Sequence, residues 1–345
     1  MSLHSEILEQ PQRLAAVLES QRSAVEQVAR EINTRGIQYI FLAARGTSDN
    51  AGRYGNYLFG GHNRLAVALA TPSLFTYYKK PPRLTGSMVI GISQSGQSPD
   101  IVSVLEEGRR QGCLTLAITN EPNSPLAKAA DFVLDIMAGP ELATAATKTY
   151  TNELMVLAML SAALNCESDC WSQLARVPQW TSEALTLDTA VGQAAQRYRY
   201  MQQCVVIGRG YNYATAFEWA LKLKELTYTI AEPYSSADFL HGPIAMVGGG
   251  FPVLAIAPHG AVSDSVLELL TSLKQDLNAE LVVVSDRDEA LSLAQSAFRL
   301  PTGIPEWLTP MVSIIPAQLF AYHLTLVKGY EPDHPRVIHK VTETR

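Results

Sequence analysis

Residues 87–100 read Ser87-Met88-Val89-Ile90-Gly91-Ile92-Ser93-Gln94-Ser95-Gly96-Gln97-Ser98-Pro99-Asp100, an apolar run that leads into a polar turn. The first six residues have the composition of a buried β-strand. Pro99 suits the first position of a helix, with Ser98 as its N-cap and Asp100 in the first turn. The stretch therefore predicts a strand, a tight turn and a helix.

This turn also has the chemistry of an anion site. The first backbone N–H groups of a helix have no partner within the helix, and the helix dipole favours a negative charge beside them. The hydroxyls of Ser93, Ser95 and Ser98 add uncharged donors, so the turn predicts a site for a phosphate monoester. A plainer interpretation, in which the serines only cap the helix, stays open.

A second interpretation of the same residues is a nucleotide site. Gly91 to Ser98 spells G-x-x-x-x-G-Gln-Ser, which differs from a P-loop at one residue. The missing residue is the lysine that reaches the terminal phosphates of a nucleotide. The sequence therefore argues against an NTPase.

The chain resembles itself at a fixed spacing. Two strand-like runs recur at an offset of 164 residues and a third pair recurs at a similar spacing, namely 39–46 with 203–210, 88–92 with 252–256, and 114–119 with 281–285. A duplicated unit explains this constant offset. In each half the apolar runs alternate with segments of helical length. The sequence therefore predicts an α/β fold with two tandem domains, each a parallel sheet flanked by helices on both faces.

We expect five segments along the chain: an N-terminal helical segment at 1–27, a first domain with the phosphate loop at 28–165, a helical linker at 166–189, a second domain at 190–328, and a C-terminal tail at 329–345. Ligands of open α/β sheets gather at the carboxyl ends of the strands. The 45–48 and 93–98 loops are both expected there.

The two halves differ in their loops. The second half has Ala257-Pro258-His259-Gly260 where the first has Ser93-Gln94-Ser95-Gly96, so we expect only the first half to bind phosphate. Gly208-Arg209-Gly210 is a weak dinucleotide signal, because Tyr213 stands where a third glycine is required. No cofactor is expected.

Composition limits the possible partners. With 345 residues, 47% of them hydrophobic, the chain is long enough for two domains, and a net charge of −6 argues against a nucleic-acid surface. The segment 1–12 is polar, unlike a signal peptide, and 311–327 is apolar but interrupted by Pro316, Gln318 and His323. We therefore expect a soluble, cytoplasmic protein with a buried core helix and no membrane partner.

Cysteine and histidine spacings indicate no metal site. Reduced thiols are the simplest interpretation of the four cysteines, which are Cys113, Cys166, Cys170 and Cys204. His334 and His339 lie five residues apart with a proline between them, which matches no familiar site. Of the seven histidines, only His241 has a functional interpretation below.

Six motifs together resemble the sugar isomerase (SIS) family. They are Arg45-Gly46-Thr47-Ser48, Ser93-Gln94-Ser95-Gly96 with Ser98, Ala145-Ala146-Thr147-Lys148, Ala220-Leu221-Lys222-Leu223-Lys224-Glu225, Phe239-Leu240-His241-Gly242-Pro243 and Lys340-Val341-Thr342. They span nearly the whole chain in the family's order. Within the family they resemble the isomerase half of glucosamine-6-phosphate synthase and the stand-alone glucosamine-6-phosphate deaminases.

The resemblance implies a phosphorylated amino sugar as substrate, no cofactor, and a homodimer with active sites at the subunit interface. It implies that Ser93, Gln94, Ser95 and Ser98 hold the phosphate and that Thr47 and Ser48 line the sugar pocket. Glu225 resembles the base that moves a proton between C1 and C2, His241 the residue that opens the ring from the partner subunit, and Lys340 the lysine of the closing tail.

The spacing of Glu218, Lys222 and Glu225 places them on one helical face. Without the family, a solvated face with a favourable Glu-to-Lys pair would explain them. With it, Glu218 joins the residues that bind substrate, and Lys222 is expected to orient Glu225 or offset its charge during catalysis.

The expected reaction is glucosamine 6-phosphate plus water to fructose 6-phosphate plus ammonia. Arg45 and Ala146 replace a cysteine and a serine of the synthase pattern and match the deaminase pattern better. The sequence also has no glutaminase segment ahead of the isomerase halves, which favours release of ammonia. Another phosphosugar isomerase, a fructosamine-6-phosphate deglycase and a non-enzymatic sugar-phosphate sensor remain alternatives.

Overall fold

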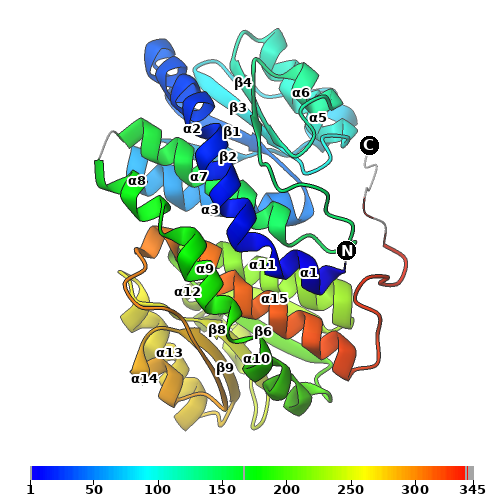
Figure 1. The fold of residues 1–345 in the computed structure, drawn as a ribbon, viewed down its shortest axis with the longest axis vertical. Coiled ribbons are helices and arrows are strands. Elements are labelled where there is room, and N and C mark those ends of the chain that lie inside the picture. The colour runs from blue at the N-terminus through cyan, green and yellow to red at the C-terminus, as the bar shows by residue number, and fades with distance from the viewer. Residues whose placement is uncertain (1, 166–167, 339, 341–345) are drawn as a thin grey trace. The chain divides into compact units, whose positions relative to one another are not determined.

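The computed structural model describes residues 2–165, 168–338 and 340, which divide into two compact units. The N-terminal unit consists of 12–141, 148–176 and 340, and the C-terminal unit of 2–11, 142–147 and 177–338. Figure 1 shows both as helices packed around strands. The segment boundaries that we expect from the sequence stay a prediction.

The N-terminal unit is built on a parallel sheet in the order β2-β1-β3-β4-β5. Its strands are β1 (Tyr39–Ala43), β2 (Ala66–Leu69), β3 (Ser87–Ile92), β4 (Leu114–Thr119) and β5 (Phe132–Asp135). Its helices are α2 (Gln10–Arg35, which begins two residues before the unit), α3 (Gly46–Asn63), α4 (Ser73–Thr76), α5 (Pro99–Arg110), α6 (Pro125–Ala129), α7 (Lys148–Asn165) and α8 (Ser168–Leu174).

The C-terminal unit contains a second parallel sheet, in the order β10-β9-β8-β6-β7. Its strands are β6 (Gln203–Gly208), β7 (Ile230–Ser235), β8 (Pro252–Ile256), β9 (Glu280–Ser285) and β10 (Ser296–Arg299). Its helices are α1 (Leu3–Leu8), α9 (Val177–Leu185), α10 (Asp188–Ala195), α11 (Tyr213–Thr227), α12 (Ser236–Leu240), α13 (Ser263–Gln275), α14 (Asp288–Ser292) and α15 (Thr309–Val327), with 3-10 turns at Gln196–Tyr198, Gly210–Asn212, Pro243–Met246 and Glu306–Leu308.

The two sheets confirm the internal repeat. Read from its other end, the second sheet has the order of the first, with β6, β8 and β9 in the places of β1, β3 and β4. These are the three pairs of runs that recur along the sequence. The predicted α/β fold with two parallel sheets is therefore confirmed.

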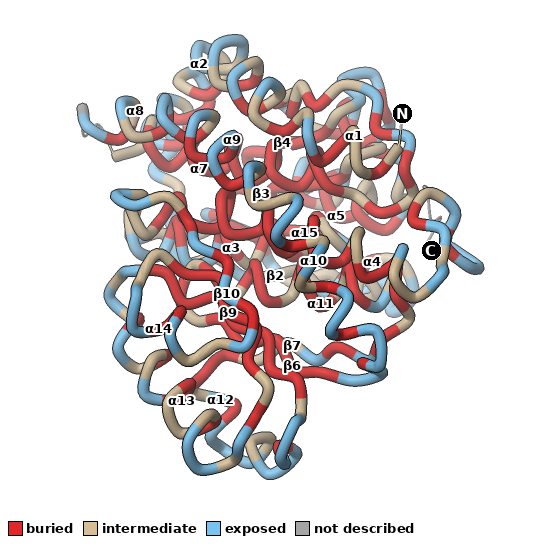
Figure 2. The backbone as a smooth tube through the Cα atoms, turned by 60° about the horizontal axis from the view of Figure 1, so that its bottom comes forward, coloured by how far each residue is buried: buried red, intermediate tan, exposed pale blue. Residues whose placement is uncertain are grey.

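Side chains alternate between the faces of each sheet, and helices cover both faces. Leu42 on β1 pairs in register with Ile90, so Val89 points to the opposite face. A Cβ built on Gly52 of α3 would lie 2.6 Å from Leu42, and one on Gly108 of α5 would lie 2.6 Å from Val89. Figure 2 shows the strands buried within the helical layers.

The apolar segment that ends the second domain forms a core helix. The stretch Glu306–Val327 is long and apolar enough to cross a membrane, but 78% of it is buried inside the structure. It packs on α9, α10 and α11, and Phe320 meets Trp219 of α11 edge to face at 5.8 Å. Burial among helices of its own unit agrees with the expected core helix.

Two of the described cysteines, Cys113 and Cys204, are free thiols. Cys113, Cys170 and Cys204 are buried, and burial raises the pKa of Cys204 to about 12, so this thiol stays protonated. Cys166 lies outside the described residues.

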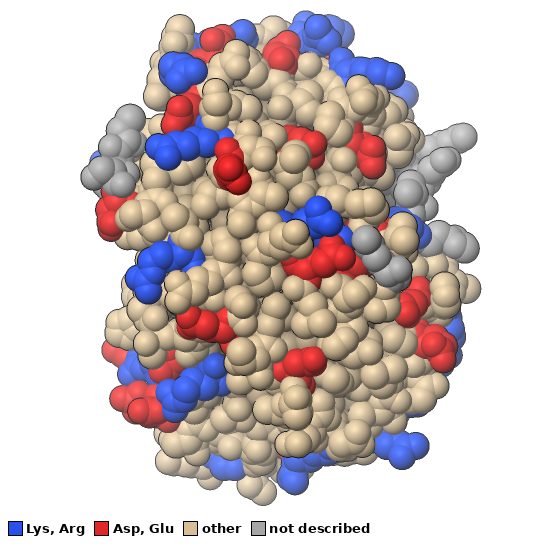
Figure 3. Space-filling view, viewed as in Figure 1, with Lys and Arg blue, Asp and Glu red and all other residues tan. Residues whose placement is uncertain are grey.

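Figure 3 shows basic and acidic side chains interspersed over the face in view.

The close approach of Gly108 to Val89 generates a test with a matched control. We expect Gly108→Ala to destabilise the fold by about 1–3 kcal/mol, because the added methyl overpacks the contact between α5 and β3. Gly60 of α3 meets nothing within 4 Å of an added Cβ, so Gly60→Ala should stabilise by about 0.4–1 kcal/mol. Urea unfolding of both variants measures the difference, and equal effects would contradict this packing.

Candidate functional site

The strand order of the N-terminal sheet reverses direction between β1 and β3. The chain passes from β1 to β2 on one side and then returns to β3 on the other. Ala43 pairs with Gly91 in register, so the 45–48 and 93–98 loops leave the same edge of the sheet. Such a switch point is where open α/β sheets bind ligands.

The loop after β3 is braced by its own polar groups. Gly96 has a φ of +61°, and a Cβ there would lie 2.1 Å from the Ser124 hydroxyl oxygen, so this position favours glycine. The Ser93 hydroxyl accepts a hydrogen bond from Gly96 N–H at 3.1 Å, and the Ser95 hydroxyl accepts one from Gln97 N–H at 3.3 Å. These two serines shape the loop.

Ser98 behaves differently from the other two serines. It occupies the N-cap position of α5, as predicted, but its side chain makes no capping hydrogen bond. Its hydroxyl is hydrogen-bonded to none of the described residues. The interpretation that the serines merely cap the helix therefore fails at Ser98, whose hydroxyl is left available to a ligand.

The backbone around Gln94 ties the loop to the neighbouring strand. Its carbonyl accepts hydrogen bonds from Asn120 N–H at 3.1 Å and from the Thr119 hydroxyl at 3.3 Å. Both donors belong to the end of β4 and the turn after it. These hydrogen bonds use the Gln94 backbone. The half-buried Gln94 side chain takes no part in them.

An ion pair joins the two loops. Arg45 Nε lies 2.7 Å from Asp100 Oδ2, and the Arg45 side chain is 51% exposed whereas that of Asp100 is 1% exposed. Arg45 follows β1, and Asp100 lies in the first turn of α5. The guanidinium, paired with this carboxylate and half exposed, therefore lies at the sheet edge from which the 93–98 loop leaves.

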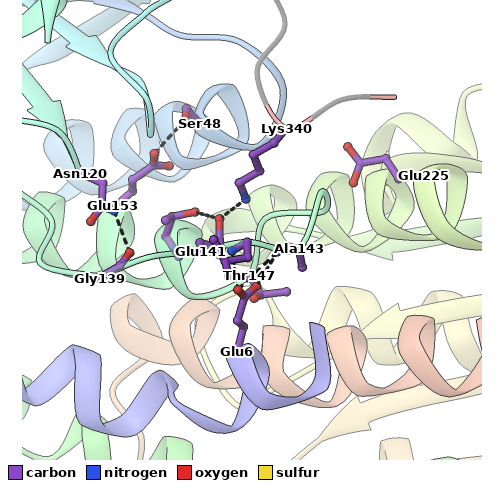
Figure 4. A network of polar contacts seen from close by, with 12 residues as sticks. Glu6, Ser48, Asn120, Gly139, Glu141, Ala143, Thr147, Glu153, Glu225 and Lys340 are labelled. Carbon is purple, nitrogen blue, oxygen red and sulfur yellow. Dashed lines mark hydrogen bonds and ion pairs between the residues drawn. The ribbon is translucent and has the colours of Figure 1, made fainter. Parts of the chain in front are cut away.

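Thr47 and Ser48 occupy the first turn of α3. Thr47 is half-buried, whereas Ser48 is buried and its hydroxyl donates to Glu153 Oε1 at 2.8 Å (Figure 4). The Ser48 proton is thus directed to α7. A role for either residue in lining a sugar pocket stays a prediction.

A row of charged side chains lies along α11 in the C-terminal unit. Lys222 Nζ lies 3.4 Å from Glu218 Oε1 and 2.6 Å from Glu225 Oε2. The side chains of Glu218 and Lys222 are 0% and 1% exposed, whereas that of Glu225 is 24% exposed. The predicted common face is therefore buried rather than solvated, and Glu225 is its end that reaches solvent.

The other predicted residues lie near chain turns. His241 follows α12 and is exposed, and its ring is hydrogen-bonded to none of the described residues. Lys340 Nζ lies 2.6 Å from Glu141 Oε2, and Glu141 also accepts from Thr149 N–H and hydroxyl at 3.1 and 2.8 Å (Figure 4). Val341 and Thr342 lie outside the described residues.

Sequence reasoning missed two buried carboxylates beside the motif at 145–148. Glu141 is the partner of Lys340, within the N-terminal unit. In the C-terminal unit Glu6 of α1, 0% exposed, accepts hydrogen bonds from Leu142 N–H at 2.5 Å and from Ala143 N–H at 3.3 Å. Glu141 lies four residues before this motif, and this proximity in the sequence was the one signal that could have identified it.

The equivalent crevice of the C-terminal sheet already holds an acidic group. Glu306 Oε2 accepts a hydrogen bond from Ala261 N–H at 2.8 Å, in the loop that follows β8. A Cβ on Gly260 would lie 2.3 Å from the Glu306 carboxyl carbon, so the two residues are in close contact. The loop of the second half, which lacks the serines of the first, thus already contacts an acidic side chain of the protein.

The SIS domain family matches this chain at residues 36–163 and 200–328. The chain is similar to the isomerizing glutamine–fructose-6-phosphate aminotransferase of Thermococcus kodakarensis, with 34% identity over 344 residues that cover 97% of this chain and 56% of that protein. The chain therefore spans about half the length of that relative.

Solved structures share the fold. The C-terminal domain of glucosamine-fructose-6-phosphate aminotransferase from Francisella tularensis has a TM-score of 0.84 and 26% identity, covering 96% of this chain and 98% of that one. Glucosamine-6-phosphate deaminase from Thermotoga maritima has a TM-score of 0.81 over the full length of both chains, at 20% identity, which shows the common fold alone.

The uncapped hydroxyl of Ser98 generates a test of the anion site. We expect Ser98→Ala to weaken inorganic phosphate binding about tenfold or more, since a hydrogen bond to a charged group contributes about 1.5–3 kcal/mol. The free energy of unfolding should change little, because the hydroxyl caps nothing.

The matched control for that test is Ser103→Ala, on the same helix. Ser103 donates to the Asp100 carbonyl at 2.7 Å, so its loss should affect stability and leave phosphate binding intact. Calorimetric titration with phosphate and urea unfolding separate the two effects. A Ser98→Ala variant that binds phosphate as well as the parent would place the anion elsewhere.

Proposed function

Because this chain belongs to the SIS domain family, we propose that it is a phosphosugar isomerase acting on a phosphorylated amino sugar. The reaction that we propose converts glucosamine 6-phosphate and water into fructose 6-phosphate and ammonia. The relative from Thermococcus kodakarensis is named a glutamine–fructose-6-phosphate aminotransferase, and the Francisella tularensis structure is a domain of a glucosamine-fructose-6-phosphate aminotransferase, which supports this substrate class.

The phosphate is held by the 93–98 loop. The Ser98 hydroxyl and the N-terminal N–H groups of α5 donate to its oxygens, and the Arg45 guanidinium supplies positive charge at the same sheet edge. The chain has a net charge of −6, so local donors rather than overall charge must attract the anion.

The observation that carries the proposal is the row Glu218, Lys222 and Glu225. A buried ammonium holds two carboxylates, and only that of Glu225 reaches solvent. Lys222 Nζ lies 2.6 Å from Glu225 Oε2 and holds this carboxylate in place on the helix. A positioned carboxylate of this kind suits proton transfer next to a carbonyl.

The chemical steps balance without a cofactor. The ring opens with help from His241, which gives the C1 aldehyde. Glu225 takes the C2 proton while the aldehyde oxygen is protonated, and the resulting enolamine receives a proton at C1. The imine left at C2 is hydrolysed by water, which releases ammonia and leaves the C2 ketone of fructose 6-phosphate.

Lys340 and Glu141 form the closing contact of this proposal. Their 2.6 Å ion pair holds the last described residue of the tail against a carboxylate that is fixed by Thr149. With substrate bound, the Lys340 ammonium would be placed over the sugar. Thr47 and Ser48 are proposed to line the pocket from α3.

Two substitutions support release of ammonia as the direction. Arg45 and Ala146 depart from the synthase pattern and agree with that of the stand-alone deaminases. Isomerisation of another phosphosugar, or cleavage of a fructosamine 6-phosphate, would use the same Glu225, and a sugar-phosphate sensor would use only the phosphate loop.

We also propose a homodimer with active sites at the subunit interface, in the cytoplasm. The ring of His241 is exposed, which supports a role at the active site of a partner subunit. Two buried free thiols, Cys113 and Cys204, support a reducing compartment.

The test of the base is Glu225→Gln. We expect kcat to fall by about 10²–10⁴ while KM changes little, because the amide cannot accept the C2 proton and the phosphate loop is untouched. Glu268→Gln, an exposed change on α13, is the control and should retain activity. Near-parental turnover of Glu225→Gln would reject the assignment.

The reaction itself is tested by supplying glucosamine 6-phosphate and following fructose 6-phosphate and ammonia together. Equal release of both supports the deaminase. Sugar-phosphate binding without either product would reject deamination of this substrate and favour one of the alternatives above.

A further inference from the structure

Two histidines and an aspartate, distant in the sequence, meet in the C-terminal unit. His4 on α1 places Nε2 2.9 Å from Asp188 Oδ2, and His323 on α15 places Nε2 2.6 Å from Asp188 Oδ1. One ligand atom from each residue lies within 4.8 Å of the others. We propose that His4, Asp188 and His323 bind a late first-row divalent cation of the zinc class.

Both imidazole rings are held in place by packing. The His4 ring stacks on Tyr322, with centroids 4.7 Å apart and planes 7° from parallel. The His323 ring lies against Gly192 of α10, where a Cβ would come within 3.1 Å of it. Rings that are oriented in advance lose little freedom on binding a metal.

The third ligand lies between the two imidazoles. Asp188 Oδ2 faces His4 Nε2 at 2.9 Å and Asp188 Oδ1 faces His323 Nε2 at 2.6 Å. Imidazole nitrogens and a carboxylate oxygen are ligands that Zn²⁺ takes. In the absence of metal, the two Nε2–H groups satisfy the Asp188 oxygens.

The ligand types select the metal. Imidazole suits Zn²⁺, Cu²⁺, Ni²⁺ and Fe²⁺, whereas Mg²⁺ and Ca²⁺ prefer oxygen ligands alone. The three side chains are 22–29% exposed, so ions can enter and a coordination position stays open to water. The site is independent of the proposed phosphosugar chemistry.

The metal would fasten α1 to its unit. His4 belongs to α1, and Asp188 and His323 belong to α10 and α15. Glu6, two residues beyond His4, holds the backbone of Leu142 and Ala143. A cation at the cluster would therefore also stabilise the 142–147 segment.

The experiment uses the full chain, stripped with a chelator and titrated with Zn²⁺ alone by calorimetry. We expect one site per chain, a rise in Tm with Zn²⁺, and at least about tenfold weaker binding in Asp188→Asn and His323→Ala. Asp188→Asn keeps an oxygen that can accept from an imidazole N–H but removes the charge that a cation requires.

The control is His259→Ala, an exposed histidine outside the cluster, which should bind Zn²⁺ as the parent does. Absence of Zn²⁺ binding by the parent would overturn the proposal, and the cluster would then be a hydrogen-bonded contact between α1, α10 and α15. Equal binding by the parent and both cluster variants would also overturn it, because adventitious surface histidines would then account for the signal.

Discussion

The parallel pairing of β1 with β3 is the constraint on which the rest of the proposed phosphate site depends. Ala43 and Gly91 are opposite one another, so the chain leaves both strands at one edge of the sheet and begins α3 and α5 there, on opposite faces. Two helix N-termini at one edge create a concentration of backbone N–H groups. The Arg45–Asp100 ion pair then fixes the separation of the two loops. The tight turn after β3 includes Gly96 in the left-handed region, close to the Ser124 hydroxyl.

Much of this arrangement could be predicted because it is local in sequence. The 87–100 stretch carries strand, turn and helix signals within a few residues of one another, and the spacing of Glu218, Lys222 and Glu225 needs only the helical period. Contacts between residues that are far apart in the sequence leave no such pattern. Lys340 meets Glu141 across 199 residues, which no periodicity could indicate. The same reason hid the cluster of two histidines and Asp188, where the sequence predicted no metal.

The buried ammonium of Lys222 is an unusual choice for a helix that packs in a core. Removing a charge from water is costly, and replacing such a group by an apolar residue often stabilises a protein. Its retention beside two carboxylates therefore favours a role other than stability. The geometry supports such a role. Lys222 pairs with Glu218 on the buried side and with Glu225 on the side that reaches solvent. A carboxylate on a rigid helix is held more accurately than one on a loop.

Glu306 has a consequence for how many substrates one chain can carry. Duplication produced two sheets with two switch points, and each has a loop whose N–H groups can donate to an acidic oxygen. In the C-terminal unit the Glu306 carboxylate already takes the Ala261 N–H and lies against Gly260. The protein's own side chain thus competes with any incoming phosphate at an effective concentration that no free metabolite reaches. Under the proposed function, the expected stoichiometry is one sugar phosphate per chain, although the fold has two such loops.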